Sequence, residues 1–152
     1  MAKVKVVLRS AQLLPYGENM QMSVWDLLPH FEQLPGFAGM EGVRQNRPEV
    51  MFAEDEGITQ ATLLLEKSGL ASEIVVRRVA ISLEAMEHRA EIVRAAMTSY
   101  RPYFSSLVID KRANTVRLKV IAATPQEIFR ELRSKLSEFA DIERETGVWL
   151  AQ

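Results

Sequence analysis

The sequence predicts an α+β fold: an antiparallel sheet with two long helices packed on one face. Several short segments alternate apolar with polar residues, which is typical of strands with one solvated face. Two longer segments, 86–100 and 124–141, carry apolar residues at spacings of three and four, which predicts amphipathic helices. A strand-rich region, a helix, a hairpin, a second helix and a tail follow one another. We therefore expect one sheet of about five or six strands around a chaperone-like or ferredoxin-like βαββα core.

The composition bounds the class of protein. The chain has 152 residues, 47% of them hydrophobic and 26% charged, which suits one globular domain with a sizeable core. The absence of cysteine excludes a disulfide scaffold and a cysteine nucleophile, and it fits a cytoplasmic protein. The net charge is −1, so no global field attracts nucleic acid. No run of about 18 apolar residues is present, so no membrane span is expected.

We expect the whole chain, 1–152, to form a single α+β domain without internal repeats. Residues 1–48 are predicted to hold a hairpin with strands over 4–8 and 20–24, a short helix over 28–34 and a Gly/Pro-rich loop. Residues 49–152 are predicted to form the main sheet–helix core.

Within the core region, alternation predicts strands over 49–52, 58–67 and 73–85, with an acidic turn at 54–57. The next helix is predicted over 86–100. A hairpin then joins 104–109 to 115–122 through a polar turn in which an asparagine suits an unusual backbone angle. The residues expected on one stripe of this first long helix are Met86, Ala90, Val93, Met97 and Tyr100.

The last helix has the clearest start signal in the chain. Thr124 is predicted at the N-cap, Pro125 at the first helical position and Glu127 where it can reach back to the cap. The helix should run to about residue 141, and the tail over 146–151 should form a last strand or a hydrophobic plug. Its expected core residues are Ile128, Leu132, Leu136 and Phe139.

Candidate catalytic and metal-binding groups are few. His30 and His88 are the only histidines, and His88 has Glu84 and Glu91 at helical spacing, which surface pairing explains as well as proton transfer does. The glycines at 36, 39 and 42 lack the strand and helix that a phosphate-binding loop needs on either side. We therefore predict no catalytic residue, no metal site and no cofactor.

Two sets of residues are candidates for binding a partner. Arg77, Arg117 and Lys119 are expected to align on the outer face of one sheet, where they would suit an acidic protein. RNA is disfavoured, because no exposed aromatic residue interleaves with these cations. The second set is apolar, lies near the two ends of the chain and favours a homodimer; its members are Met20, Met22, Trp25 and Trp149.

The second half of the chain resembles the YbjN group and the related type III secretion chaperones. The best local match is Leu107-Val-Ile-Asp-Lys-Arg-Ala-Asn-Thr-Val-Arg-Leu followed by Thr124-Pro-Gln-Glu-Ile. The resemblance covers about half the chain and rests on the order of elements. It implies a small dimer that holds another protein and has no enzyme activity.

The expected function is therefore non-enzymatic binding of another protein, as a chaperone or adaptor and as a homodimer. The alternative is a small-molecule-sensing regulatory domain of ferredoxin-like fold, similar to amino-acid-sensing ACT domains. Fold by itself decides neither.

Overall fold

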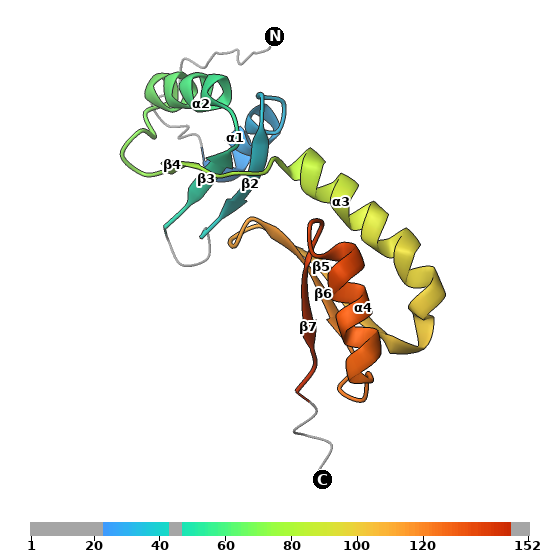
Figure 1. The fold of residues 1–152 in the computed structure, drawn as a ribbon. Helices are drawn as coiled ribbons and strands as arrows, with labels where there is room; N and C mark the ends of the chain where they lie inside the picture. The colour runs from blue at the N-terminus through green and yellow to red at the C-terminus, as the bar shows by residue number, and fades with distance from the viewer. Residues whose placement is uncertain (1–22, 43–46, 147–152) are drawn as a thin grey trace.

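The computed structural model describes residues 23–42 and 47–146 (Figure 1). The strand expected over 4–8, residues 20–22 of the strand expected over 20–24 and the tail from residue 147 onward lie outside the described residues. Ser23 and Val24, expected at the end of that second strand, instead begin a helix. The α+β class is confirmed: in the described part, four α-helices accompany two three-stranded sheets. Each sheet combines an antiparallel and a parallel strand pair, so the expectation of one purely antiparallel sheet is wrong.

The first sheet belongs to an N-terminal unit of residues 23–78. This unit contains α1 (Val24–Phe31), β2 (Phe37–Glu41), β3 (Glu49–Phe52), α2 (Asp55–Ser68) and β4 (Val75–Arg78). β3 is the central strand, antiparallel to β2 and parallel to β4. Both helices pack on one face of the sheet, and the buried residues of this core are Leu27, Phe31, Val50, Phe52, Ala61, Leu65, Leu70 and Ile74.

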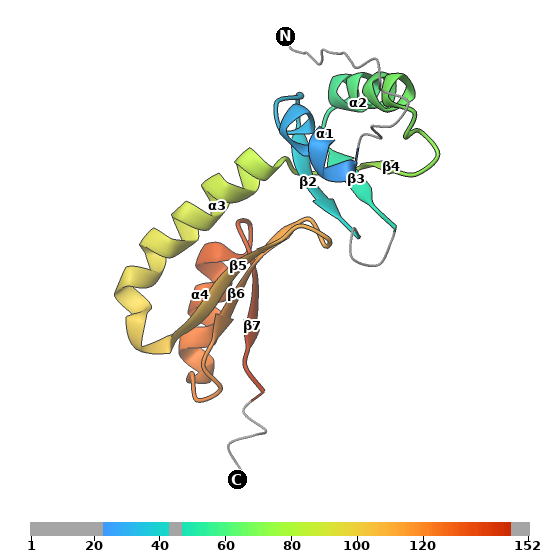
Figure 2. The same ribbon diagram turned by 180° about the vertical axis from the view of Figure 1, so that it is seen from behind.

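The second sheet belongs to a C-terminal unit of residues 83–146, seen from behind in Figure 2. It contains α3 (Leu83–Ala96), a 3₁₀ segment (Met97–Tyr103), β5 (Phe104–Asp110), β6 (Thr115–Val120), α4 (Gln126–Leu136) and β7 (Asp141–Arg144). The stripe predicted for the first long helix is buried in full. This stripe belongs to one hydrophobic core, whose other buried residues are Val116, Leu118, Val120, Leu132, Leu136 and Ala140.

The two units repeat the same topology, α-β-β-α-β, with the second strand in the centre of each sheet. The repetition extends to detail. A bulge follows Phe37 in β2 and Phe104 in β5, at the same place in the two registers. The last residue of β4, Arg78, donates to the first residue of α2, and Arg144 at the end of β7 donates to Gln126, the first residue of α4.

The repeat is hidden in the sequence because equivalent positions differ in chemistry. On the outer face of the N-terminal sheet, Ala38, Met51 and Val79 form a small buried cluster. The equivalent positions in the C-terminal sheet hold Ser105, Lys119 and Glu145, and there the Ser105 hydroxyl donates to the Glu145 carboxylate at 2.6 Å. One outer face is therefore covered by protein and the other is adapted to water.

The segment predicted as a strand over 58–67 is the helix α2, and the acidic turn before it is the first helical turn. Asp55 and Glu56 stabilise a helix N-terminus, and Gly69, at φ 75°, ends the helix in the left-handed conformation. Buried residues recur every four positions, at Gly57, Ala61 and Leu65. The run of β-branched and aliphatic residues hid this helical period.

The strand predicted over 73–85 is only four residues long, because β4 ends at Arg78 and α3 begins five residues later at Leu83. Ser82 starts that helix by accepting a hydrogen bond from the backbone N–H of Ala85. The expected loop over 35–48 contains β2, which is antiparallel to β3 and is joined to it through residues 42–48.

Two predicted helix starts are also corrected. The short helix begins at Val24, with a capping box formed by Ser23 and Asp26, and Pro29 lies inside it. In α4 the N-cap is Pro125; the hydroxyl of Thr124 instead donates to the carbonyl of Ile121 at 2.7 Å. Pro125 itself is extended, with a ψ of 148°, so the helix starts one residue later than expected.

Candidate functional site

The two units meet where the β5–β6 turn contacts the linker between them, residues 79–82. Asn114 has a φ of 57°, in the left-handed region that asparagine tolerates. Its side-chain oxygen accepts from the backbone N–H groups of Ala80 (3.1 Å) and Ile81 (2.9 Å), and its amide nitrogen donates to the carbonyl of Ile81 at 2.7 Å. One side chain therefore holds the linker against the turn.

The same turn covers the outer face of the N-terminal sheet. A Cβ at Gly39, where φ is 140°, would lie 2.9 Å from Cδ of Lys111, so a larger residue would push the lysine stem away. Arg77 of β4 donates to the backbone carbonyl of Arg112 at 3.3 Å. This contact explains why the equivalent outer face is apolar in the N-terminal unit only.

Arg77 therefore helps to hold the β5–β6 turn against the N-terminal unit, at the contact between the two units. Its Nε donates to Glu49 Oε1 at 2.7 Å, which leaves the guanidinium balanced by a carboxylate on the neighbouring strand. The alignment expected for the three cations does not occur, because Arg77 lies in the N-terminal sheet while Arg117 and Lys119 lie in the C-terminal sheet.

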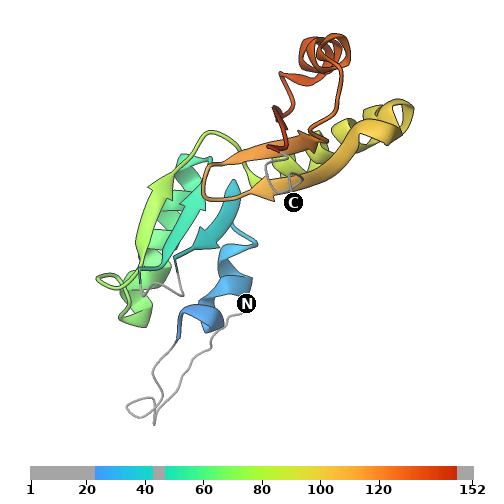
Figure 3. The same ribbon diagram turned by 90° about the horizontal axis from the view of Figure 1, so that it is seen from below.

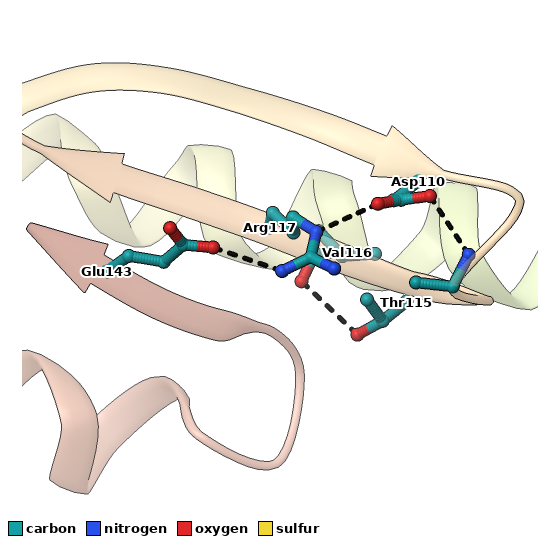
Figure 4. A network of polar contacts seen from close by, with 6 residues as sticks. Asp110, Thr115, Val116, Arg117 and Glu143 are labelled. Atoms are coloured by element: carbon teal, nitrogen blue, oxygen red, sulfur yellow. Dashed lines mark hydrogen bonds and ion pairs between the residues drawn. The ribbon is translucent and has the colours of Figure 1, made fainter. Parts of the chain in front are cut away.

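Arg117 is at the centre of the polar network in Figure 4. It donates to Asp110 Oδ2 at 2.9 Å and to Glu143 Oε2 at 3.0 Å. The backbone N–H of Ala113, and then Arg117, hold the pKa of Asp110 below its ordinary value. The charge of Arg117 is thus compensated within its own sheet, and of the three predicted cations Lys119 is the one left exposed.

A second polar network ties the 3₁₀ segment to α4. The hydroxyl of Tyr100 donates to Glu131, and Lys135 Nζ donates to the Tyr100 oxygen at 2.8 Å. Tyr100, and then Lys135, lower the pKa of Glu131. Since Tyr100 is only 9% exposed, this network is a structural support for the core beneath it.

A hollow of about 290 Å³ lies between the two units, with the C-terminal end of α1 on one side and the start of α3 on the other. Its walls combine apolar side chains with carboxylates, an environment that suits an organic cation with an apolar chain. The lining residues are Glu32, Leu34, Gly36, Phe37, Glu54, Ser82, Leu83, Glu84 and Glu87.

The described residues contain no group of three or more His, Asp or Glu side chains placed to hold a metal ion. His88 is exposed on α3, and His30 lies in the last turn of α1, in the other unit. No helix in the described part of the chain is long and apolar enough to cross a membrane.

Among the large apolar residues that the structure describes, Trp25 is the most exposed, at 61%. It lies in the first turn of α1, whose other side buries Leu27 and Phe31 completely. The other members of the predicted apolar set, Met20, Met22 and Trp149, lie outside the described residues.

Sequence reasoning identified Asn114 as a turn residue and missed its contact with the linker. The signal that was present, an asparagine suited to a left-handed angle, explains the turn and carries no information about what the side chain reaches. No family model and no curated protein matches the sequence, so the assignment of a function rests on the geometry described above.

Proposed function

We propose that the protein is a non-enzymatic protein-binding domain, chaperone-like or adaptor-like, that acts as a cytoplasmic homodimer. The observation that carries the proposal is Trp25, whose side chain is 61% exposed on a capped helix. The resemblance of the second half to the YbjN group and the type III secretion chaperones supports the same role.

Trp25 suits a binding role because of how it is presented. The Ser23–Asp26 capping box and the buried residues Leu27 and Phe31 hold α1 in place, so the indole loses little further freedom on binding. A tryptophan buries about 150–250 Å² when it is covered, and tryptophan is enriched among the residues that dominate protein interfaces. An acidic partner would find exposed Lys119 on the other unit, away from this helix.

Replacement of Trp25 should separate binding from stability. We expect Trp25→Ala to lose proteins that the wild type retains in a pull-down analysed by mass spectrometry, while its free energy of unfolding changes by less than about 0.5 kcal/mol. Leu63→Ala is the matched control, because Leu63 is 51% exposed on the neighbouring helix α2. Retention of the same proteins by Trp25→Ala and the wild type would contradict the proposal.

A small-molecule-sensing role is the second candidate, and the hollow between the units supports it. A ligand that binds only the folded protein raises the melting temperature. If the hollow binds cations, spermidine should raise the melting temperature of the wild type and of a charge-matched control. It should have no such effect on the double variant Glu84→Gln/Glu87→Gln. To match the loss of two charges, the control carries Glu66→Gln together with Glu138→Gln, both exposed and outside the hollow. An equal rise in all three proteins would remove the hollow as the binding site.

A further inference from the structure

In the described part of the chain, four strands form the edges of the two sheets: β2 and β4 in the N-terminal unit, and β5 and β7 in the C-terminal unit. The outer backbone groups of an edge strand can pair with another chain unless the strand is short, charged, irregular or covered. The four edges can therefore be compared within one molecule.

Three of the edges are protected. β4 has the sequence Val-Val-Arg-Arg and β7 has Asp-Ile-Glu-Arg, so each is four residues long and carries at least two charges. β2 has five residues, contains a bulge and Gly39, and is contacted by the side chain of Lys111.

β5 lacks most of this protection. It has seven residues, more than any other described strand, and Phe104 to Ile109 include no charge, proline or glycine. Two of its large apolar residues are exposed, Phe104 at 39% and Val108 at 50%. Only the bulge near its start remains as a device against pairing.

We propose that β5 pairs with β5 of a second copy of this chain, antiparallel and across a two-fold axis, to give a continuous six-stranded sheet. In Figure 3, β5 is the golden strand that lies beside the orange β6 in the C-terminal unit. The inference rests on the proposed homodimer and goes beyond it by naming the strand.

The partner strand is β5 of a second copy, because two β5 strands can pair without placing like charges opposite each other. For an antiparallel register centred between Leu107 and Ile109, Val108 lies near its own copy while Asp110 does not face another Asp110, and the charge of Asp110 is already balanced by Arg117. Self-pairing of β4 would instead bring two Arg-Arg pairs together within a four-residue strand. A two-fold axis perpendicular to the sheet also keeps α3 and α4 of both copies on one face and the polar face around Arg117 in water.

Opposite charges placed at Val108 test this pairing. Wild type should scatter light as a species of twice the 17.2 kDa of one chain. Val108→Glu and Val108→Lys should each be a folded monomer by circular dichroism and light scattering, because in each variant the new charge meets its own copy near the axis. An equimolar mixture of the two variants should recover the dimer. Val75→Glu is the control and should stay dimeric, since Val75 is 59% exposed on the other sheet's edge strand.

The outcomes distinguish failure of the β5 pairing from failure of the proposed homodimer. A monomeric wild type at high micromolar concentration would overturn both the β5 pairing and the homodimer, and would leave the Trp25 surface to its own test. A wild-type dimer that both Val108 variants preserve would overturn the β5 pairing alone. Loss of the dimer with only one sign of charge, or no recovery on mixing, would also overturn self-pairing.

Discussion

Leu132→Ala should lower the free energy of unfolding by about 2–5 kcal/mol. Leu132 is fully buried in α4, within the core that α3, β6 and α4 share. Truncation removes apolar contacts and leaves a cavity, because the surrounding helices and strands relax only in part. Denaturant unfolding followed by circular dichroism measures the change.

The matched control for this prediction is Leu63→Ala, an identical truncation at a position that is 51% exposed on the other unit's helix. It should change the free energy of unfolding by less than about 0.5 kcal/mol. Equal stability of Leu132→Ala and the wild type would mean that α4 does not close the core of the C-terminal unit.

Asn114→Gly should lower the free energy of unfolding by about 2 kcal/mol, the sum of a few hydrogen bonds at about 0.5–1.5 kcal/mol each. Glycine accepts the φ of 57°, so the loss reports the three side-chain bonds to Ala80 and Ile81 together with the weaker contact of Asn114 Nδ2 with Met86 Sδ at 3.8 Å. Asn114→Ala should cost about 1–2 kcal/mol more, because alanine is strained in the left-handed region.

Amide hydrogen exchange identifies the site of this effect. Both Asn114 variants should speed exchange at Ala80 and Ile81, whose N–H groups bond to the asparagine oxygen. Ala113→Gly, an exposed change in the same turn, should leave these two amides as slow as in wild type. Unchanged exchange in Asn114→Gly would show that the linker does not depend on this side chain.

The contact of Asn114 with the linker is important for the arrangement of the two units, because the units have separate cores. No residue of the N-terminal core belongs to the C-terminal core, so the relative position of the units depends on surface contacts: those of the turn with the linker and with β2, and those of α3 with β2. Weakening Asn114 should therefore loosen the arrangement of the units before it melts either one.

The C-terminal unit was the more predictable from sequence, for a local reason. The apolar stripe from Met86 to Tyr100, the hairpin with its polar turn and the burial of Leu132 and Leu136 all follow from periods of two or four residues. The N-terminal unit was misread where local signals compete. Aliphatic residues over 58–67 suit a strand by propensity, yet Ala61 and Leu65 pack as one face of a helix against the sheet.

The candidate sites divide in the same way. Exposure of Trp25 follows from a helix that has one buried side, although the sequence placed that residue after a strand. The ion pairs of Arg77 and Arg117 could not be predicted from the sequence, because their carboxylates come from other strands. Arg77 pairs with Glu49, and Arg117 pairs with Asp110 and Glu143.

The sequence by itself determined the α+β class, the apolar faces of α3 and α4, and the asparagine conformation in the β5–β6 turn, since each depends on residues close together in the chain. Only the tertiary structure decided that the chain folds as two units of one topology. The tertiary structure also decided that Asn114 in the turn contacts Ala80 and Ile81 of the linker, which precede it by 34 and 33 residues. It likewise decided that β5 is an unprotected edge strand. Strand order and unit contacts join residues far apart in the chain, and no local period of the sequence records which distant partner a strand or turn will meet.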